Sequence, residues 1–152
     1  MTTIPRILTI QDMSSIGRCS LTVMLPIISA LQCQAVPLAT AVLSNHLEYP
    51  YFEIVDLSDH LTAFMDCWEK NNIDFNAIVS GFLASPEQIY LVEEAINRFG
   101  KDKMVIVDPA MADDGRLYSI YTPEMVKAMR HLISRAYIVK PNYTEACFLL
   151  DK

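Results

Sequence analysis

The sequence is poor in cysteine and has no long hydrophobic run. Four cysteines stand among 152 residues, and no two of them form a Cys-x-x-Cys pair. A disulfide framework and a cysteine-based metal site are therefore not indicated, and reduced thiols in the cytoplasm are expected. The longest apolar stretch, residues 21–31, is interrupted by Pro26 and is shorter than the roughly 18 residues of a membrane span. Residues 1–11 lack the apolar segment of a secretory signal, so no membrane partner is expected.

The sequence also has fewer positively charged than negatively charged residues. The 12 Lys and Arg residues are outnumbered by 18 Asp and Glu residues, which gives a formal net charge of −6 at pH 7. This balance argues against nucleic-acid binding and against binding to an anionic membrane. Hydrophobic residues make up 52% of the chain. A chain of this length and composition is expected to fold as one domain with its own core.

Short apolar runs alternate along the chain with segments of helical spacing. Such a run is typical of a buried parallel strand, and apolar residues three and four positions apart indicate a helix. The expected strands are residues 7–10, 35–43, 77–79, 104–107 and 137–139. Helices are expected between them and after the last one. This order predicts a three-layer α/β/α fold, in which a mostly parallel sheet carries helices on both faces.

Local signals mark where several of these helices begin. Ser85 and Thr122 each precede a proline, and both are predicted N-caps. Ser58 is predicted to cap the helix that precedes the third strand. Gly100 is expected to end the helix that Ser85 begins.

Two of the predicted strands run directly into polar side chains. The fourth strand is followed by Asp108 and then by Asp113, and the fifth by Asn142 and Glu145. Ligands of open α/β sheets bind beyond the carboxyl ends of the strands. Carboxylate and amide oxygens at these ends would suit Mg²⁺ and a polyphosphate. The alternative for the aspartates is a turn, because turns favour Asp and Gly.

Asn142 and Glu145 also fit a structural role. An asparagine N-cap with a glutamate three residues later forms a capping box, which stabilises a helix by about 1 kcal/mol. Spacing alone favours this cap over a ligand contact. The two roles are compatible, because a glutamate in the first helical turn can also hold a metal-bound water.

Polar side chains follow the first and second predicted strands as well. Residues 11–17 are suited to hydrogen-bond a polar ligand, and His46 could offer a donor or an acceptor to a ring substituent. The alternative for His46 is a loop histidine in water. The sequence contains neither a P-loop pattern nor the Gly-x-Gly-x-x-Gly fingerprint, so a phosphate group would be bound by other means.

Five ordered segments together resemble the pyridoxal kinase branch of the ribokinase superfamily. Their order is more specific than any one of them alone. The segments are Ile10-Gln11 with Gly17, Leu43-Ser44-Asn45-His46, Ser80-Gly81-Phe82-Leu83, Asp108-Pro109-Ala110-Met111-Ala112-Asp113 and Pro141-Asn142-Tyr143-Thr144-Glu145.

The resemblance implies a ribokinase-like fold and ATP-dependent phosphorylation of the 5′-hydroxymethyl group of a vitamin B6 vitamer (pyridoxal, pyridoxamine or pyridoxine). It implies that ATP is bound by three residues, Asp108, Asn142 and Glu145. It implies that Mg²⁺ lies near Asp113 and Glu145. It implies that the vitamer is bound by Asp12, His46 and Phe82. A homodimer is implied for the intact enzyme.

Several positions depart from the family pattern. Asp12 stands where the family often has serine, and Leu47-Glu48 replaces a Thr-Gly pair. Ala112 replaces a glycine beside the metal loop. Lys140 stands where a threonine is expected near a monovalent cation site. Our hypothesis is that the Lys140 ammonium substitutes for that cation. These differences bear on the exact substrate more than on the reaction.

The family pattern also includes a Gly-x-Gly-Asp loop in the second half of longer chains, whose aspartate is the general base. This sequence has no such motif. Residues 1–152 are therefore expected to be the N-terminal part of a single kinase domain, without a catalytic base and with apolar surface left uncovered. Two alternatives remain open. One is the hydroxymethylpyrimidine kinase of thiamine synthesis, which shares the strand-end motifs, and the other is a catalytically inactive truncated fragment.

Overall fold

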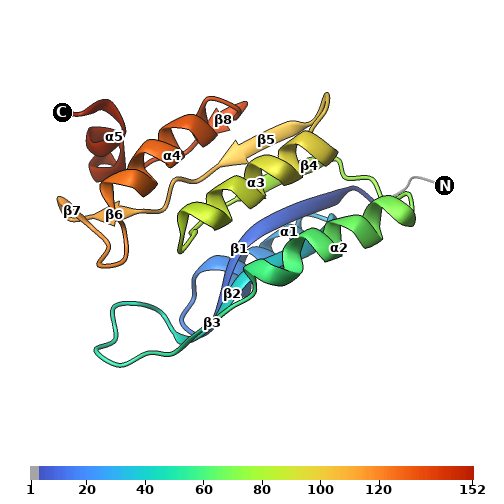
Figure 1. The fold of residues 1–152 in the computed structure, drawn as a ribbon. Coiled ribbons are helices and arrows are strands. Elements are labelled where there is room, and N and C mark those ends of the chain that lie inside the picture. Colours follow the sequence, from blue (N-terminus) through green and yellow to red (C-terminus); the bar gives the residue numbers. More distant parts are fainter. Residues whose placement is uncertain (1–3) are drawn as a thin grey trace.

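The computed structural model describes residues 4–152, which form an α/β fold around a six-stranded sheet (Figure 1). The strands of this sheet are β1 (Arg6–Ile16), β2 (Gln34–Asn45), β3 (Ile54–Asp56), β4 (Ala77–Ser80), β5 (Met104–Val107) and β8 (Ile138–Val139). A separate two-stranded ribbon consists of β6 (Ala112–Asp113) and β7 (Arg116–Leu117). The helices are α1 (Ser20–Ala30), α2 (Ser58–Lys70), α3 (Pro86–Phe99), α4 (Pro123–Ile133) and α5 (Tyr143–Leu150).

The sheet is mostly parallel, as the sequence predicts. Its strand order is β3-β2-β1-β4-β5-β8, and only the short β3 pairs antiparallel with its neighbour. The inner strands are covered on both faces, so their apolar runs are continuous rather than alternating. Leu8 and Ile10 of β1 and Ile78 of β4 have no exposed surface.

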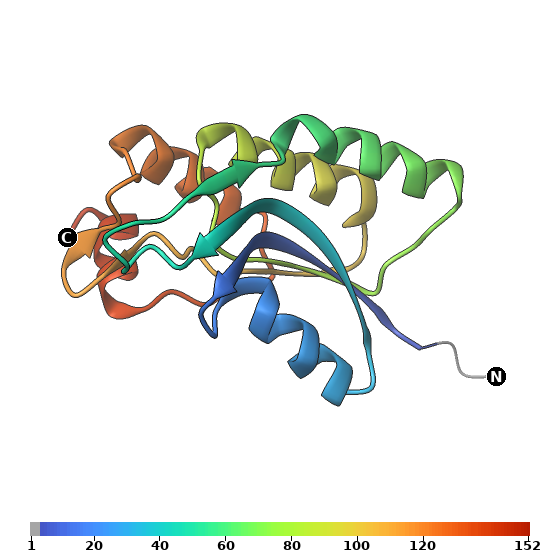
Figure 2. The same ribbon diagram turned by 90° about the horizontal axis from the view of Figure 1, so that it is seen from below.

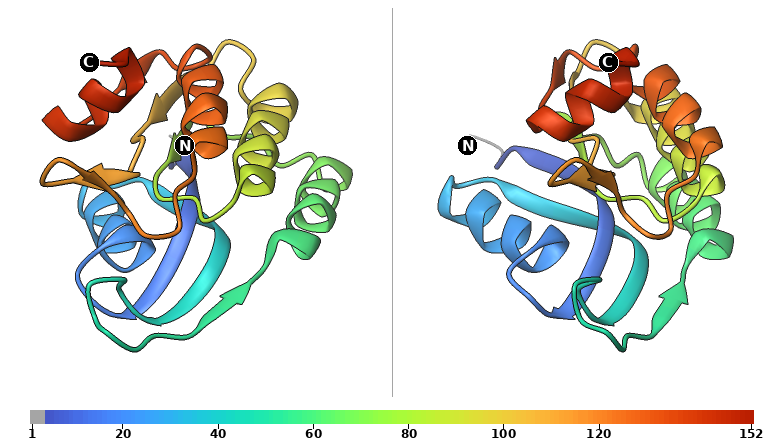
Figure 3. Two further views of the ribbon diagram at one scale, coloured as in Figure 1. Left: turned by 60° about the vertical axis from the view of Figure 1, so that its left-hand side comes forward. Right: turned by 90° about the vertical axis from the view of Figure 1, so that its left-hand side faces the viewer.

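Helices cover both faces of the sheet, which confirms the predicted three layers. Helices α2, α3 and α4 lie side by side on one face, and α1 packs against β1 and β2 on the other (Figures 2 and 3). Helix α5 lies next to α4 and β6. The helices of the first face contribute buried side chains to one core, among them Leu61, Met65, Ile89, Val92, Met125 and Met129. Within residues 4–152, no helix has the length and apolar character needed to cross a membrane.

The predicted N-caps at Ser85 and Thr122 are confirmed. The Ser85 hydroxyl accepts a hydrogen bond from the backbone N–H of Gln88, at 3.2 Å. The Thr122 hydroxyl accepts one from the N–H of Met125, at 3.3 Å. Gly100 ends α3 as predicted.

The predicted cap at Ser58 is wrong. The N-cap residue is Leu57, and Ser58 is the first residue of α2. The Ser58 hydroxyl donates to the carboxylate of Asp56 instead. Asp56 lies at the end of β3, so a short strand that the sequence pattern did not indicate diverts this side chain from capping. Helical spacing in α2 also predicts Phe64 on the apolar face together with Leu61 and Met65, but Phe64 is 54% exposed whereas the other two are buried.

Strand β1 is longer than the sequence pattern predicts. The expected strand ends at Ile10, whereas β1 continues to Ile16 because it pairs with β2 along its length. The register shifts on the way: Gln11 pairs with Ala39, but Met13 pairs with Val42. One strand therefore has an extra residue at this point, which is a β-bulge. Bulges bend a strand, redirect its side chains and are frequent next to binding sites.

Candidate active site

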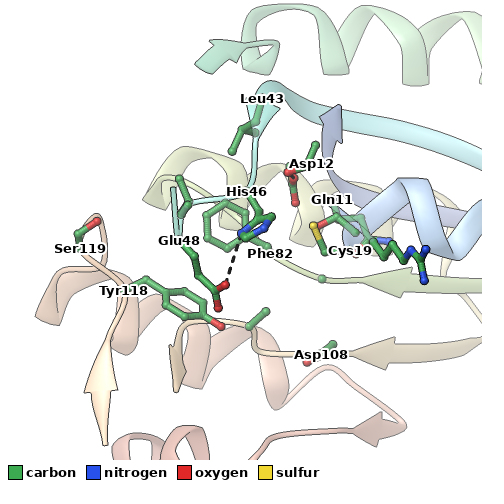
Figure 4. Close-up of a pocket in the computed structure, with 16 residues that line it drawn as sticks. Gln11, Asp12, Cys19, Leu43, His46, Glu48, Phe82, Asp108, Tyr118 and Ser119 are labelled. Atoms are coloured by element: carbon green, nitrogen blue, oxygen red, sulfur yellow. Dashed lines mark hydrogen bonds and ion pairs between the residues drawn. The ribbon is translucent and has the colours of Figure 1, made fainter. Parts of the chain in front are cut away.

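A cavity of about 510 Å³ opens where the carboxyl-terminal parts of β1, β2, β4 and β5 meet (Figure 4). The three residues predicted to bind the ring of a substrate, Asp12, His46 and Phe82, all line it. Asp108, predicted to bind ATP, lines it as well. The fold therefore brings four predicted site residues, each on or after a different strand, into one cavity.

Gln11 and Asp12 of β1 both face this cavity. Asp12 is 2% exposed, and its Oδ2 accepts a hydrogen bond from the Ser14 hydroxyl at 3.0 Å. Within residues 4–152, neither Oδ1 of Asp12 nor Nε2 of Gln11 has a hydrogen-bond partner. Burial raises the pKa of Asp12, while the nearby hydroxyls of Ser20 and Ser14 oppose the rise. Gly81 leaves room for the Gln11 amide, since a Cβ there would lie 2.1 Å from its Oε1.

His46 is held at the end of β2 by its backbone. Its N–H donates to the carbonyl of Ile16 at 3.1 Å, which ties the ends of β1 and β2 together. Its ring lies 4.8 Å from the ring of Tyr49, and its Nδ1 is 3.7 Å from Oε2 of Glu48. Gly17 has a φ of +139°, and a Cβ at this residue would lie 2.9 Å from Cδ2 of His46. Gly17 is thus needed both for its backbone conformation and for the close approach of His46.

Aromatic rings line another wall of the cavity. The Phe82 ring lies 6.2 Å from that of Tyr118 and 6.4 Å from that of Tyr121. Tyr118 lines the cavity, and burial together with the charge of Glu145 raises its pKa, so the phenol is neutral. An apolar wall with a few polar groups opposite is the usual form of a small-molecule site.

Tyr118 and Arg18 line the cavity without having been predicted. Tyr118 arrives there because the β6–β7 ribbon turns the chain back, and its N–H donates to the carbonyl of Met111 at 2.9 Å. The signal that could have found it is the Asp113-Asp114-Gly115 turn, which favours a tight hairpin. Arg18 has no comparable signal in the sequence.

Asp108 forms an ion pair with Lys140. The two residues follow β5 and β8, and Nζ of Lys140 lies 3.0 Å from Oδ2 of Asp108. The hydrogen bond and the negative charge of Asp108 raise the pKa of Lys140. The ammonium is therefore charged at neutral pH and lies at the edge of the cavity. The sequence alone did not predict this contact.

Asn142 and Glu145 form the predicted capping box at the start of α5. The Asn142 side chain accepts from the N–H of Glu145 at 2.8 Å, and the N–H of Asn142 donates to Oε2 of Glu145 at 2.7 Å. Oε1 of Glu145 accepts from the N–H of Met111 at 3.3 Å. Glu145 is 3% exposed, and burial raises its pKa. Both residues lie outside the lining of the cavity, so their predicted contacts with ATP stay predictions.

The residues present do not form a resident metal site. Among residues 4–152, no group of three or more His, Cys, Asp or Glu side chains is placed to hold a metal ion. Both oxygens of Glu145 already accept backbone hydrogen bonds. Asp113 is exposed on the ribbon, and its Oδ1 accepts from the N–H of Asp114. The predicted Mg²⁺ roles of Asp113 and Glu145 therefore stay predictions, which apply to a metal that arrives with substrate phosphates and keeps several waters.

The match to a known family covers most of the chain. Residues 25–152 match the phosphomethylpyrimidine kinase family. The chain belongs to this family. The chain is also similar to a proposed pyridoxal kinase of Schizosaccharomyces pombe, to which it is 27% identical over 116 residues. The aligned segment covers 71% of this chain and 33% of the yeast protein.

Solved structures confirm the fold expected for a kinase of the pyridoxal and phosphomethylpyrimidine type. A proposed phosphomethylpyrimidine kinase from Bacteroides thetaiotaomicron, in a crystal form with pyridoxal, is 44% identical, with a TM-score of 0.95 over 99% of this chain and 53% of that one. The pyridoxal kinase from Lactobacillus plantarum is 29% identical, with a TM-score of 0.88 over 98% and 54%. This chain thus spans about half the length of these two structures.

Proposed function

We propose that the protein to which this chain belongs transfers the γ-phosphoryl group of ATP to the 5′-hydroxymethyl group of a vitamin B6 vitamer. The observation that carries the proposal is the cavity that joins Asp12, His46 and Phe82 at the carboxyl ends of three strands. Its volume and its aromatic wall suit a single substituted heteroaromatic ring. A neighbour that is 44% identical is described with pyridoxal, which supports the choice of ring.

The ring end of the cavity would position the substrate. Phe82 and Tyr118 offer apolar contact to a ring, while His46 and Asp12 offer polar atoms to its substituents. In phosphoryl transfer the protein mainly aligns the reactants and neutralises charge. Asp12, His46 and Phe82 would align the substrate ring, because β1, β2 and β4 hold them in fixed positions.

The phosphate end would lie at Asp108 and Lys140. The Lys140 ammonium is exposed beside the cavity and could approach a phosphate oxygen without leaving Asp108. Mg²⁺, when it arrives with ATP, would neutralise phosphate charge, with Asp113 as the exposed carboxylate nearby. The ion pair also supports the hypothesis that Lys140 fulfils the role of a monovalent cation.

A second candidate function is phosphorylation of 4-amino-5-hydroxymethyl-2-methylpyrimidine. The description of the matching family and that of the Bacteroides neighbour both favour it. The same cavity would hold the pyrimidine, and the hydroxymethyl group would again be the acceptor. Direct comparison of the two substrate types separates the candidates.

The test is an ATP-dependent assay on the longer protein that contains this chain, with the three vitamers and the pyrimidine as acceptors. We expect phosphorylation of at least one vitamer, with a higher kcat/KM than for the pyrimidine. His46→Ala should lower that kcat/KM roughly tenfold, as expected for one lost polar contact. His60→Ala, on the exposed side of α2, is the matched control. Turnover of the pyrimidine alone would select the second candidate, and no turnover at all would contradict both.

The purified 152-residue chain is expected to show no phosphoryl transfer on its own. The Gly-x-Gly-Asp motif, whose aspartate is the general base in the family that the sequence resembles, is absent from the sequence. The same coupled assay checks this expectation, and ATP- and pyridoxal-dependent turnover by the chain alone would contradict it. Homodimer formation by the longer protein and a cytoplasmic location are part of the same proposal.

A further inference from the structure

The β6–β7 ribbon places one wall of the cavity. Tyr118 and Ser119, which line the cavity, come directly after β7. The ribbon is separate from the six-stranded sheet, and each of its two strands has only two residues. A two-stranded hairpin on its own is marginally stable in water. The position of Tyr118 therefore depends on the contacts that hold this ribbon against the rest of the fold.

The first turn of α5, which lies beside the ribbon (Figure 1), holds the ribbon at its base. Nδ2 of Asn142 donates to the carbonyl of Ala112 at 2.8 Å, and Oε1 of Glu145 accepts from the N–H of Met111 at 3.3 Å. Ala112 and Met111 have no exposed surface, so breaking these bonds would leave buried backbone groups unpaired. The segment that leads into the ribbon is thus fixed to α5.

A third contact holds the tip of the ribbon. Asp114 and Gly115 form the two-residue loop between the paired residues Asp113 and Arg116, and their φ angles are +46° and +79°. Two positive φ angles are typical of the tight turn that closes such a hairpin. The N–H of Gly115 donates to Oγ1 of Thr144 at 3.0 Å. Thr144 thus adds a bond at the exposed end of the ribbon, which the two bonds at its base do not reach.

Helix α5 is itself fixed, so it can support the ribbon. Nη2 of Arg130 on α4 donates to the carbonyl of Phe148 at 2.6 Å and also bonds the carboxylate of Asp151, the C-cap residue of α5. A continuous series of contacts therefore runs from α4 through α5 and the ribbon to Tyr118. The Tyr118 ring in turn lies 6.2 Å from that of Phe82 on the aromatic side of the cavity.

Thr144 can be altered separately from the other two contacts. Asn142 and Glu145 also form the capping box of α5, so changing either of them would disturb the helix itself. Thr144 has no part in that box, and it does not line the cavity. Its hydroxyl can therefore affect a ligand in the cavity only through the ribbon.

We propose that Thr144 is a positioning residue: by holding the tip of the β6–β7 ribbon, it keeps Tyr118 in place against the ring of a bound substrate. This inference rests on the proposed function, since it assumes that an aromatic ring occupies this cavity. Release of the tip lets Tyr118 move away from Phe82, and the bound ring then loses aromatic contact on one side.

Isothermal titration calorimetry on the longer protein, without ATP, measures the effect on ring binding. The probes are pyridoxine and 4-amino-5-hydroxymethyl-2-methylpyrimidine, and the variants are compared with the probe that the parent binds more tightly. Thr144→Val keeps the shape of the side chain but removes the hydroxyl. It should weaken the Kd roughly three- to tenfold, the range of one aromatic contact. Thr144→Ser returns the acceptor and should restore the parent Kd.

Thr62→Val is the matched control. Thr62 is also a half-buried helical threonine, and its hydroxyl donates to Glu94 at 3.3 Å, outside the cavity. The substitution removes the same group and one hydrogen bond to a neighbouring element. It should leave the Kd unchanged, because the contact that it removes lies between α2 and α3.

A double-mutant cycle shows whether Thr144 acts through Tyr118. Tyr118→Ala removes the ring that the ribbon positions. In this background Thr144→Val should have no further effect on the Kd, because the side chain that it positions is gone. A general loosening of the fold would instead weaken binding by the same factor in both backgrounds. Circular dichroism checks that each variant is folded.

Four results would overturn the inference: a Thr144→Val variant that binds the ring as the parent does, a Thr144→Ser variant that binds as weakly as Thr144→Val, an equal loss with and without Tyr118, or no binding of either ring to the folded parent. The transfer assay tests the proposed function separately. If no phosphoryl group is transferred while the cycle behaves as expected, the proposed function fails and the role of Thr144 stands. If transfer occurs while Thr144→Val leaves ring binding unchanged, the reverse holds.

Discussion

At the scale of single residues, the cavity contains a carboxylate that opposes folding. Asp12 is almost fully buried, and desolvation raises its pKa above the ordinary value of 3.8. The folded state therefore binds the Asp12 proton more tightly than the unfolded chain does. As pH rises from about 3.8 through the raised pKa, the group contributes a growing destabilisation, which is complete above that pKa. Binding sites commonly retain groups that reduce stability in this way.

Asp12→Asn should therefore become more stable relative to the parent chain as pH rises from 3.5 to 7. The amide cannot ionise, so it avoids the cost that the carboxylate incurs over this window. Each kcal/mol gained should raise the Tm by about 2–4 °C for a chain of this size. Thermal unfolding followed by circular dichroism at several pH values measures the difference, with Asp102→Asn as the control for one lost charge. A Tm difference for Asp12→Asn that stays constant or shrinks with pH would contradict the account.

Lys140 gives a second prediction at this scale. If its ammonium acts as the cation at Asp108, 3.0 Å away, then phosphorylation by the longer protein should be independent of K⁺. Lys140→Thr should lower kcat by roughly tenfold or more in K⁺-free buffer, and added K⁺ should restore part of the loss. Lys127→Thr on α4 is a matched control. The hypothesis fails if the unmodified enzyme needs K⁺ for activity.

At the scale of elements, the sequence predicts what is local. The caps at Ser85 and Thr122 and the box at Asn142 and Glu145 depend on contacts within one helical turn, and all are present. The cap at Ser58 fails because Asp56, two residues earlier at the end of the unpredicted strand β3, accepts from the same hydroxyl. The extension of β1 is a product of pairing.

In the candidate site, too, some residues could be predicted from the sequence and others depend on how distant segments pack. Asp12, His46, Phe82 and Asp108 follow predicted strands, and parallel strands bring their carboxyl ends to one edge of a sheet. Their meeting could therefore be predicted. Tyr118 depends on the path of the β6–β7 ribbon, whose two-residue strands carry almost no periodic signal.

Gln88 of α3 connects three elements and is fully buried. Its Oε1 accepts from the N–H of Ala84 at 2.8 Å, and its Nε2 donates to the carbonyl of Thr40 at 3.2 Å and to Asp56 at 3.3 Å. The loop after β4, strand β2 and the end of β3 are thus held by one amide. Ser85 and Gln88 form only one half of a capping box, because the Gln88 side chain makes these bonds and does not bond the N–H of Ser85.

Gln88→Met should destabilise the fold by about 1–3 kcal/mol, because an apolar side chain of similar length cannot replace the amide bonds to the buried carbonyl of Thr40 and to the partly buried groups of Ala84 and Asp56. Urea unfolding of the purified chain measures the free energy of unfolding. Glu87→Met, one residue earlier and exposed, is the matched control and should change it by less than about 1 kcal/mol. A Gln88 variant as stable as the control would show that the amide bonds contribute little.

At the scale of the molecule, the sheet has an open edge at β8. Among residues 4–152 this strand has one neighbour in the sheet, β5, and Tyr137 and Ile138 are 77% and 41% exposed. An unpaired edge with exposed apolar side chains is a template for association with another strand. The uncovered apolar surface expected from the sequence is thus found at a defined place.

The 152-residue chain should therefore self-associate at micromolar concentrations. Ile138→Lys should shift it toward monomer, because a lysine on an edge strand disfavours strand addition. Size-exclusion chromatography with light scattering measures the mass of each form. Tyr90→Lys, at an exposed apolar position on α3, is the control and should associate like the parent. A parent chain that is monomeric over the whole concentration range would contradict the expectation.

The bulge between β1 and β2 has a practical consequence for altering this protein. In a regular strand, neighbouring side chains point to opposite faces, yet Gln11 and Asp12 both line the cavity where the register shifts. Two adjacent codons therefore encode two of the polar side chains that β1 contributes to the cavity, beside Ser14. A library that randomises only these two codons would vary the donors and acceptors at positions 11 and 12, so new ring selectivities could be sought without changing the rest of the gene.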